Sequence, residues 1–223
     1  MALGIILAVL VLLEIGNVFV KKVRNTSFQR IWSTAHKLLG CGILLLAVLH
    51  LVLTWQLLKQ RPFAMYVFGI LMILCAAVAL VSFLLRRQLQ RKWMVLHRSA
   101  SVGLLLCLIV HVIFGITSLN QYQNAIGAIA LQEIDLAQVG DGTYIGECDA
   151  GYVYAKVEVV VRGGRMETIS LLEHRTERGK PAEEIVHTML AHQQLQVDAV
   201  SGATNSSKVI MQAAQNAVQG NGV

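Results

Sequence analysis

Charged residues, prolines and cysteines are all scarce in this sequence. Of its 223 residues, 14% are Asp, Glu, Lys or Arg, two are proline and four are cysteine, whereas 55% are hydrophobic. Soluble domains carry about 25% charged residues, so this composition, with a mean hydropathy of +0.59, excludes a chain that is soluble throughout. The apolar excess lies before residue 118. We therefore expect a membrane domain at 1–118, a linker at 119–140 and a soluble domain at 141–223.

Two further absences narrow the chemistry. Three of the cysteines lie inside apolar runs, where they serve as small apolar side chains, and Cys148 stands alone in the polar part, so neither a disulfide framework nor a cysteine-rich metal site is expected. No Gly-x-Gly-x-x-Gly motif is present, which excludes the usual nicotinamide site. The net charge of +6 is gathered between apolar runs, a pattern typical of membrane topology and not of nucleic-acid binding.

Four apolar segments are long enough, or nearly so, to cross about 30 Å of hydrocarbon at about 1.5 Å per residue. They cover residues 2–20, 34–58, 64–85 and 94–117. The first lacks the basic leader and the small-residue cleavage site of a signal peptide, so we expect it to be retained. The pattern predicts an all-α bundle of four transmembrane helices.

Basic residues follow the first and third apolar segments. They are Lys21, Lys22, Arg24 and Arg30 in one group and Arg86, Arg87, Arg91 and Lys92 in the other. Because basic loops stay in the cytoplasm, the sequence predicts a multi-pass protein of the cytoplasmic (inner) membrane, with its N-terminus and its soluble domain on the extracytoplasmic side. The second and fourth helices then run in the same direction.

The apolar segments contain four histidines in two pairs with equal spacing. His36 and His50 lie on the second segment, and His97 and His111 on the fourth, each pair 14 positions apart. Fourteen positions return to within about 40° of the same helix face, about 21 Å further along. Two parallel helices would bring His36 level with His97 and His50 level with His111, the arrangement that ligates haem iron axially. A single membrane histidine more often bonds to a neighbouring helix or is hydrated near a helix end, but the repeated spacing favours ligands.

Over residues 30–118, this pattern resembles the diheme four-helix core of cytochrome b and the membrane part of ferric reductases and NADPH oxidases. The resemblance implies two b-type haems and electron transfer. Glu14 is an acid inside the first segment. It is expected either to relay protons at a quinone site or to be neutral and hydrogen-bonded to a neighbour.

The soluble part reads as a small α+β domain. Apolar and polar residues alternate over 152–161, which predicts a strand. Gly163 and Gly164 supply a hairpin turn, and Met166–Leu172 form the second strand of the hairpin. Pro181 opens a helix to about Gln194, and a last helix runs from about Asn205 to Val218.

The loop from Asp198 to Ser206 consists of small and hydroxylated residues before that last helix. It would present hydroxyls and free N–H groups at a helix N-terminus, which is a phosphate site. An ordinary cap by Ser201 or Thr204 explains the loop equally well.

Residues 141–219 resemble the FMN-binding domain in flavoprotein subunits of the Rnf and sodium-translocating NADH:quinone reductase complexes. The resemblance lies in a signature whose matching residues are Asp198, Ser201, Gly202, Ala203, Thr204 and Ser206. It implies that a flavin transferase esterifies the Thr204 hydroxyl with FMN phosphate outside the cytoplasm. Glu173 and His174 are expected either to border the flavin or to lie in a solvated loop.

The sequence thus predicts a four-helix membrane bundle with a small extracytoplasmic α+β FMN-binding domain. We expect electrons to pass from membrane quinol or a cytoplasmic reductase, through two haems, to FMN and then to an extracytoplasmic acceptor. One alternative is a haem-free lipid anchor for an FMN shuttle. The other is a terminal reductase whose flavin acts directly on ferric iron or quinone.

Overall fold

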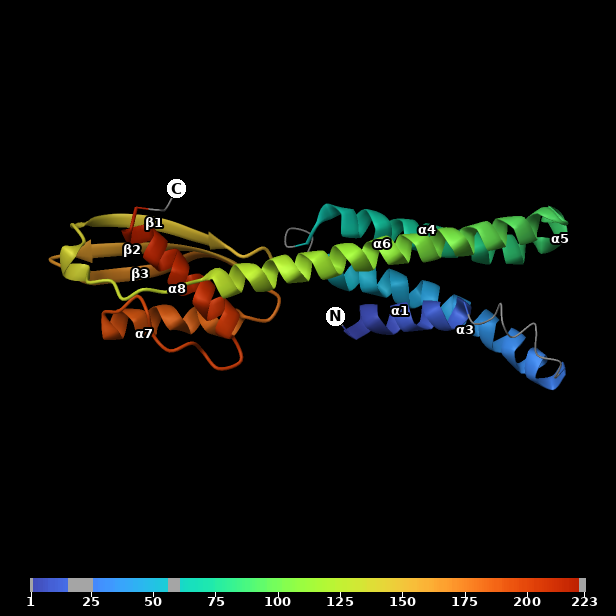
Figure 1. Cartoon of the computed structure of the whole chain (residues 1–223), viewed down its shortest axis with the longest axis horizontal. Coiled ribbons are helices and arrows are strands. Elements are labelled where there is room, and N and C mark those ends of the chain that lie inside the picture. The colour runs from blue at the N-terminus through green and yellow to red at the C-terminus, as the bar shows by residue number, and fades with distance from the viewer. Residues whose placement is uncertain (1, 16–25, 56–60, 221–223) are drawn as a thin grey trace. The chain divides into compact units, whose positions relative to one another are not determined.

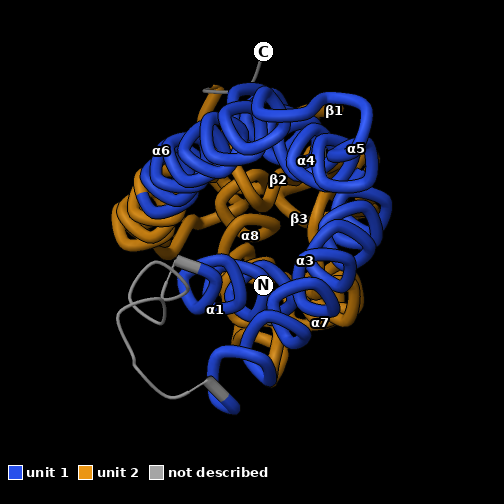
Figure 2. The backbone as a smooth tube through the Cα atoms, turned by 90° about the vertical axis from the view of Figure 1, so that its right-hand side faces the viewer, with its two compact units in different colours: residues 1–116 blue, residues 117–223 orange. Residues whose placement is uncertain are grey.

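The computed structural model describes residues 2–15, 26–55 and 61–220. The chain divides into two compact units, residues 1–116 and 117–223 (Figure 2). The first is helical, and the second combines a sheet with helices.

The described residues of the first unit are helical (Figure 1). They form α1 (Ala2–Ile15), α3 (Thr26–Thr54), α4 (Phe63–Leu84), α5 (Arg86–Leu89) and the start of α6 (Lys92–Ala128). Within the part of the chain that the structure describes, three stretches are long and apolar enough to cross a membrane: Ser27–Thr54, Phe63–Leu84 and Lys92–Ala128. The helical membrane region is therefore confirmed. The count of four spans is not, because α1 is a shorter apolar helix and residues 16–20 of the predicted first segment lie outside the described residues.

Within this unit α1 packs against α3, and α3 packs against α4. Figure 1 shows α3 and α6 running in the same direction, opposite to α1 and α4. The buried cluster is small, formed by Leu7, Val11, Ile43 and Leu108. Most other large apolar side chains are exposed. Lipid tails are as apolar as leucine, so this surface suits a bilayer.

α6 continues eleven residues past the predicted end at 117. The apolar run stops there, but Tyr122, Ala125, Ile126 and Ile129 follow at helical spacing and pack against the core of the second unit. Tertiary packing of one helix face therefore prolongs the helix beyond the apolar run. The segment 119–140, expected to be a linker, begins as helix.

In the second unit, three antiparallel strands form a sheet in the order β1-β2-β3. They are β1 (Gly142–Asp149), β2 (Tyr154–Arg162) and β3 (Arg165–Arg175). Gly163 and Gly164 have φ of +56° and +71° and make the predicted two-residue turn. The helix predicted from Pro181 is a 3₁₀ helix, η3 (Lys180–Glu184), followed by α7 (Ile185–His192), and the last helix is α8 (Thr204–Val218).

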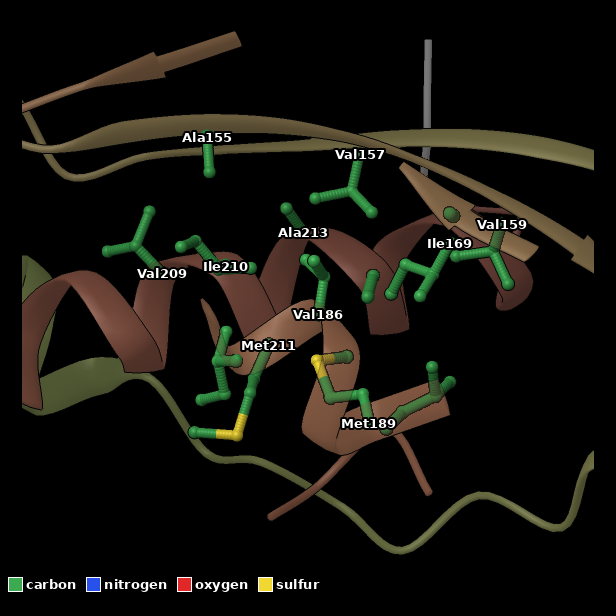
Figure 3. Packing of buried hydrophobic residues seen from close by; sticks show 14 of the residues in the cluster. Ala155, Val157, Val159, Ile169, Val186, Met189, Val209, Ile210, Met211 and Ala213 are labelled. Atoms are coloured by element: carbon green, nitrogen blue, oxygen red, sulfur yellow. The ribbon is translucent and has the colours of Figure 1, made fainter. Parts of the chain in front are cut away.

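The core of this unit lies between the sheet and α8 (Figure 3). Alternate residues of β2 face inward with no exposed surface: Ala155, Val157, Val159 and Val161. They meet the apolar face of α8, and Met189 of α7 closes the other side of that helix. On β1, a Cβ built on Gly146 would strike the α8 backbone at Ala213 and Ala217. Glycine at this position therefore lets the helix lie directly on the strand.

Because no space exists for a side chain there, Gly146→Ala should destabilise the second unit by about 1–3 kcal/mol. Amide hydrogen exchange of β2 in full-length protein in lipid nanodiscs measures this loss. The matched control is Gly127→Ala in α6, where a Cβ meets nothing within 4 Å, and which should stabilise the helix by about 1 kcal/mol. Unchanged protection of β2 in Gly146→Ala would contradict the close packing.

Candidate functional site

The N-terminus of α8 carries the predicted signature. Gly202 has a φ of +77°, a left-handed conformation that glycine adopts without strain. The residue at the N-cap position is Ala203, which is buried and offers no side-chain cap. Neither Ser201 nor Thr204 is therefore the N-cap, and the first turn of the helix lacks the usual side-chain acceptor. Thr204 is exposed at the first helical position, so its hydroxyl is accessible beside the positive end of α8.

The loop before α8 is held by Ser207, a buried residue outside the predicted set. The Val200 N–H donates to Ser207 Oγ (3.1 Å), and the Ser207 hydroxyl donates to the Ala203 carbonyl (3.1 Å). The Ala203 N–H closes the turn on the Val200 carbonyl (3.0 Å). A hydroxyl on the apolar face of α8 is the sequence signal for this role. The buried Ser207 side chain stabilises the loop through these hydrogen bonds, whereas Asp198 and Ser201 of the signature remain exposed.

The segment after β3 lies beside the first turn of α8. Thr176 Oγ1 and Ser206 Oγ are 3.2 Å apart, and the Gly179 N–H donates to Thr176 Oγ1 (2.9 Å). A Cβ on Gly179 would strike the side chains of both Ser206 and Thr176. Ser206 is thus a packed contact between two segments, while Thr204 stays outside it.

His174 and Glu173, predicted together, have different surroundings. The His174 side chain is 2% exposed, and its Nδ1 donates to Glu183 Oε1 (3.0 Å). Among the residues that the structure describes, its Nε2 has no hydrogen-bond partner. Successive strand residues point to opposite faces, and Glu173 is exposed and paired with Arg175 (3.2 Å). Of these two residues, His174 presents a buried nitrogen without a hydrogen-bond partner, which is the kind of group that a ligand satisfies.

The four histidines of the first unit lie in two pairs, an inner pair (His36 and His97) and an outer pair (His50 and His111), and their contacts differ. The His36 and His97 rings lie level, with centroids 6.1 Å apart and planes at 86°. His50 is close enough to His111 for an electrostatic interaction between the two side chains. At His97 and His111, Nδ1 donates to a helix carbonyl, Ala79 O and Met65 O respectively, each at 2.9 Å.

Glu14 contacts the inner pair, because its carboxylate accepts a hydrogen bond from His36 Nδ1. Glu14 is therefore hydrogen-bonded to a neighbour, as one of its two predicted roles requires. A ring whose Nδ1 is held in this way presents Nε2, and metal-binding histidines are typically oriented by such bonds. The described residues hold no group of three or more metal-ligating side chains. A haem needs two protein ligands at most, one on each side of the iron.

A comparison with known families finds a match within the second unit. Residues 151–219 match the FMN-binding domain, and we call the unit that contains them the FMN-binding unit. The match includes His174, Ser207 and the whole 198–206 loop, and excludes the membrane helices. No curated protein and no solved structure matches the chain. An FMN-binding domain indicates flavin-based electron transfer, and the uncapped α8 N-terminus fits the phosphate of that cofactor.

Cys148, the one cysteine of the FMN-binding unit, should react slowly with thiol reagents. Burial, with a smaller contribution from the Asp149 carboxylate, raises the pKa of Cys148 to about 11. The neutral thiol therefore stabilises the fold at neutral pH, and this contribution is lost as the pH rises toward about 11. We expect an exposed cysteine introduced by Ala199→Cys to react with maleimide at pH 8 well before Cys148. Equal rates would mean that β1 opens readily.

Proposed function

We propose that this chain transfers electrons across the cytoplasmic membrane to FMN held covalently on Thr204 at the extracytoplasmic face. The observation that carries the flavin half is an accessible hydroxyl at an uncapped helix N-terminus, inside a match to the FMN-binding domain. The α8 N–H groups would neutralise the phosphate, and Asp198, Ser201, Gly202 and Ala203 would shape the turn around it. Transfer of the flavin phosphoryl group from a flavin dinucleotide to the Thr204 hydroxyl would break the phosphoanhydride bond of the donor, releasing the nucleoside monophosphate and the hydroxyl proton, so the chain gains FMN less one water.

Thr204→Ala should abolish flavin attachment, because it removes the esterified oxygen while alanine remains a good helix former. Co-expression with a flavin transferase, followed by intact-mass spectrometry and in-gel fluorescence, measures the attachment. Thr204→Ser should retain it. Thr143→Ala, at an exposed threonine of β1, is the matched control and should be labelled normally. A label that persists in Thr204→Ala would place the linkage elsewhere.

The haem half of the proposal is supported by the level His36 and His97 rings and by the hydrogen bonds that orient them. His36 and His97 would hold a b-type haem near the cytoplasmic side, and His50 and His111 a second one nearer the extracytoplasmic side. Haem supplies one-electron redox chemistry, which flavin converts into two-electron chemistry. The residues themselves orient the imidazoles, through the Glu14 carboxylate and the Ala79 and Met65 carbonyls.

Purified protein should contain about two b-type haems per chain, since each level supplies the two axial ligands that a haem takes. Pyridine haemochrome analysis gives the count, and the absorption spectrum gives the ligation state. His111→Ala should lower the count by one, and His187→Ala, at an exposed position of α7, should leave it unchanged. Colourless protein after expression with ample haem would remove the haem half of the proposal.

The chain contains no nicotinamide motif, so the proposed donor is membrane quinol or a separate cytoplasmic reductase. The acceptor would be an extracytoplasmic protein or oxidant. An alternative, a haem-free membrane anchor for an FMN shuttle, is favoured by one observation. Hydrogen bonds from Nδ1 at three of the histidines also suit rings that only join helices.

A relay through the outer pair makes flavin reduction depend on His111. In FMN-loaded protein in nanodiscs, quinol or a membrane-side reductant should reduce the flavin of His111→Ala far more slowly than that of the parent or of His187→Ala. In intact cells, an impermeant maleimide should label Ala199→Cys from the outside. Undiminished flavin reduction would favour the anchor, and labelling only after cell lysis would reverse the topology.

A further inference from the structure

Two tyrosines from distant parts of the chain stack next to the first turn of α8. Tyr122 lies near the end of α6, and Tyr152 in the loop between β1 and β2, with ring centroids 5.2 Å apart and planes at 25°. Asn205, the residue after Thr204, donates from Nδ2 to the Tyr122 hydroxyl (2.8 Å). All three belong to the second unit, so the aromatic pair is attached directly to the turn that carries Thr204.

The two rings are held in place by specific contacts and are not simply part of the buried core. Both tyrosines are half-buried, and although Tyr122 packs against the buried core, neither tyrosine is one of its buried members. Gly151, with a φ of +85°, makes the sharp turn that precedes Tyr152 in the loop between β1 and β2. Asn205 stands in the first turn of the helix, where asparagine side chains often bond to the local backbone, yet its amide is directed to Tyr122. Residues from α6, the β1–β2 loop and α8 thus hold two aromatic rings against the first turn of α8.

We propose that the Tyr122 and Tyr152 pair is the platform on which the isoalloxazine ring of the Thr204-linked flavin stacks. The inference rests on the proposed flavin attachment at Thr204. A ring tethered through its phosphate to the first residue of α8 is confined to the surroundings of that turn, and Asn205 brings the pair there. Flat aromatic systems prefer offset stacking on such faces. Tyr122 lies outside the 151–219 match, so the prolonged end of α6 supplies half of the platform.

The stacking is tested in FMN-loaded, full-length protein by the visible circular dichroism and the emission of the flavin. Tyr122→Leu and Tyr152→Leu should each lower the flavin dichroism and raise its emission several-fold, because a free ring loses its fixed orientation and its tyrosine quencher. Tyr122→Phe keeps an aromatic face but loses the bond to Asn205, so it should retain more of the dichroism than Tyr122→Leu. Tyr144→Leu is the matched control, since Tyr144 bonds instead to the Gly140 carbonyl (2.8 Å), and should change neither signal.

Intact mass separates this proposal from the attachment itself. Parent protein without a mass gain would refute attachment at Thr204, whereas full attachment with unchanged dichroism and emission in both leucine variants would refute the platform alone. Hydrogen exchange of β2 shows whether each variant is folded. If the leucine variants unfold, Asn205→Ala and Tyr122→Phe, which keep both rings but remove the hydrogen bond that holds Tyr122, should each still lower the dichroism. An unchanged signal in both of these folded variants would leave the pair a purely structural contact.

Discussion

The close packing of α8 on the sheet is the constraint on which the rest of the FMN-binding unit depends. Four inward residues of β2 are fully buried against this helix, and Gly146 brings the β1 backbone against it. A helix held this closely along its length has a fixed first turn. The position of each residue in this turn then determines its surroundings. Ala203 is buried, Thr204 is exposed, and Ser206 is packed against Thr176. The core therefore buries Ser206 and leaves Thr204 accessible in the first turn of α8.

The membrane unit is held together by a different balance of apolar burial and polar contacts. Its buried apolar cluster is small and most of its large apolar side chains are exposed, because in lipid such side chains lose nothing by facing outward. Polar contacts between helices then carry much of the specificity. Those of His36 with Glu14, His97 with Ala79 and His111 with Met65 join α1 to α3 and α4 to α6. The same bonds that orient imidazoles for a metal would also orient helices, so one set of contacts serves both proposed roles.

The two halves of the candidate flavin site differ in how they are built. The α8 turn is local, made by residues close together in sequence. His174 and the aromatic pair are not, since each comes from another element and reaches its place only through the sheet and α6. Such long-range placement explains why the orphaned His174 nitrogen and the Tyr122–Asn205 bond have no counterpart in a short signature. It also explains why Glu173, next to His174 in the chain, faces away from it.

Hydropathy, glycine placement and the 198–206 signature were sufficient to determine the membrane region, the Gly163–Gly164 hairpin, the last helix and the FMN-binding domain, because each depends on neighbouring residues. The tertiary structure alone decided the remainder. Residues past 117 stay helical because Tyr122 and Ile126 pack on a distant core, and the helix opened by Pro181 begins as a 3₁₀ helix, Lys180–Glu184. Ala203, not a hydroxyl residue, is the N-cap because the core buries it. These features arise from contacts between residues far apart in the chain, which periodicity and motif spacing do not encode.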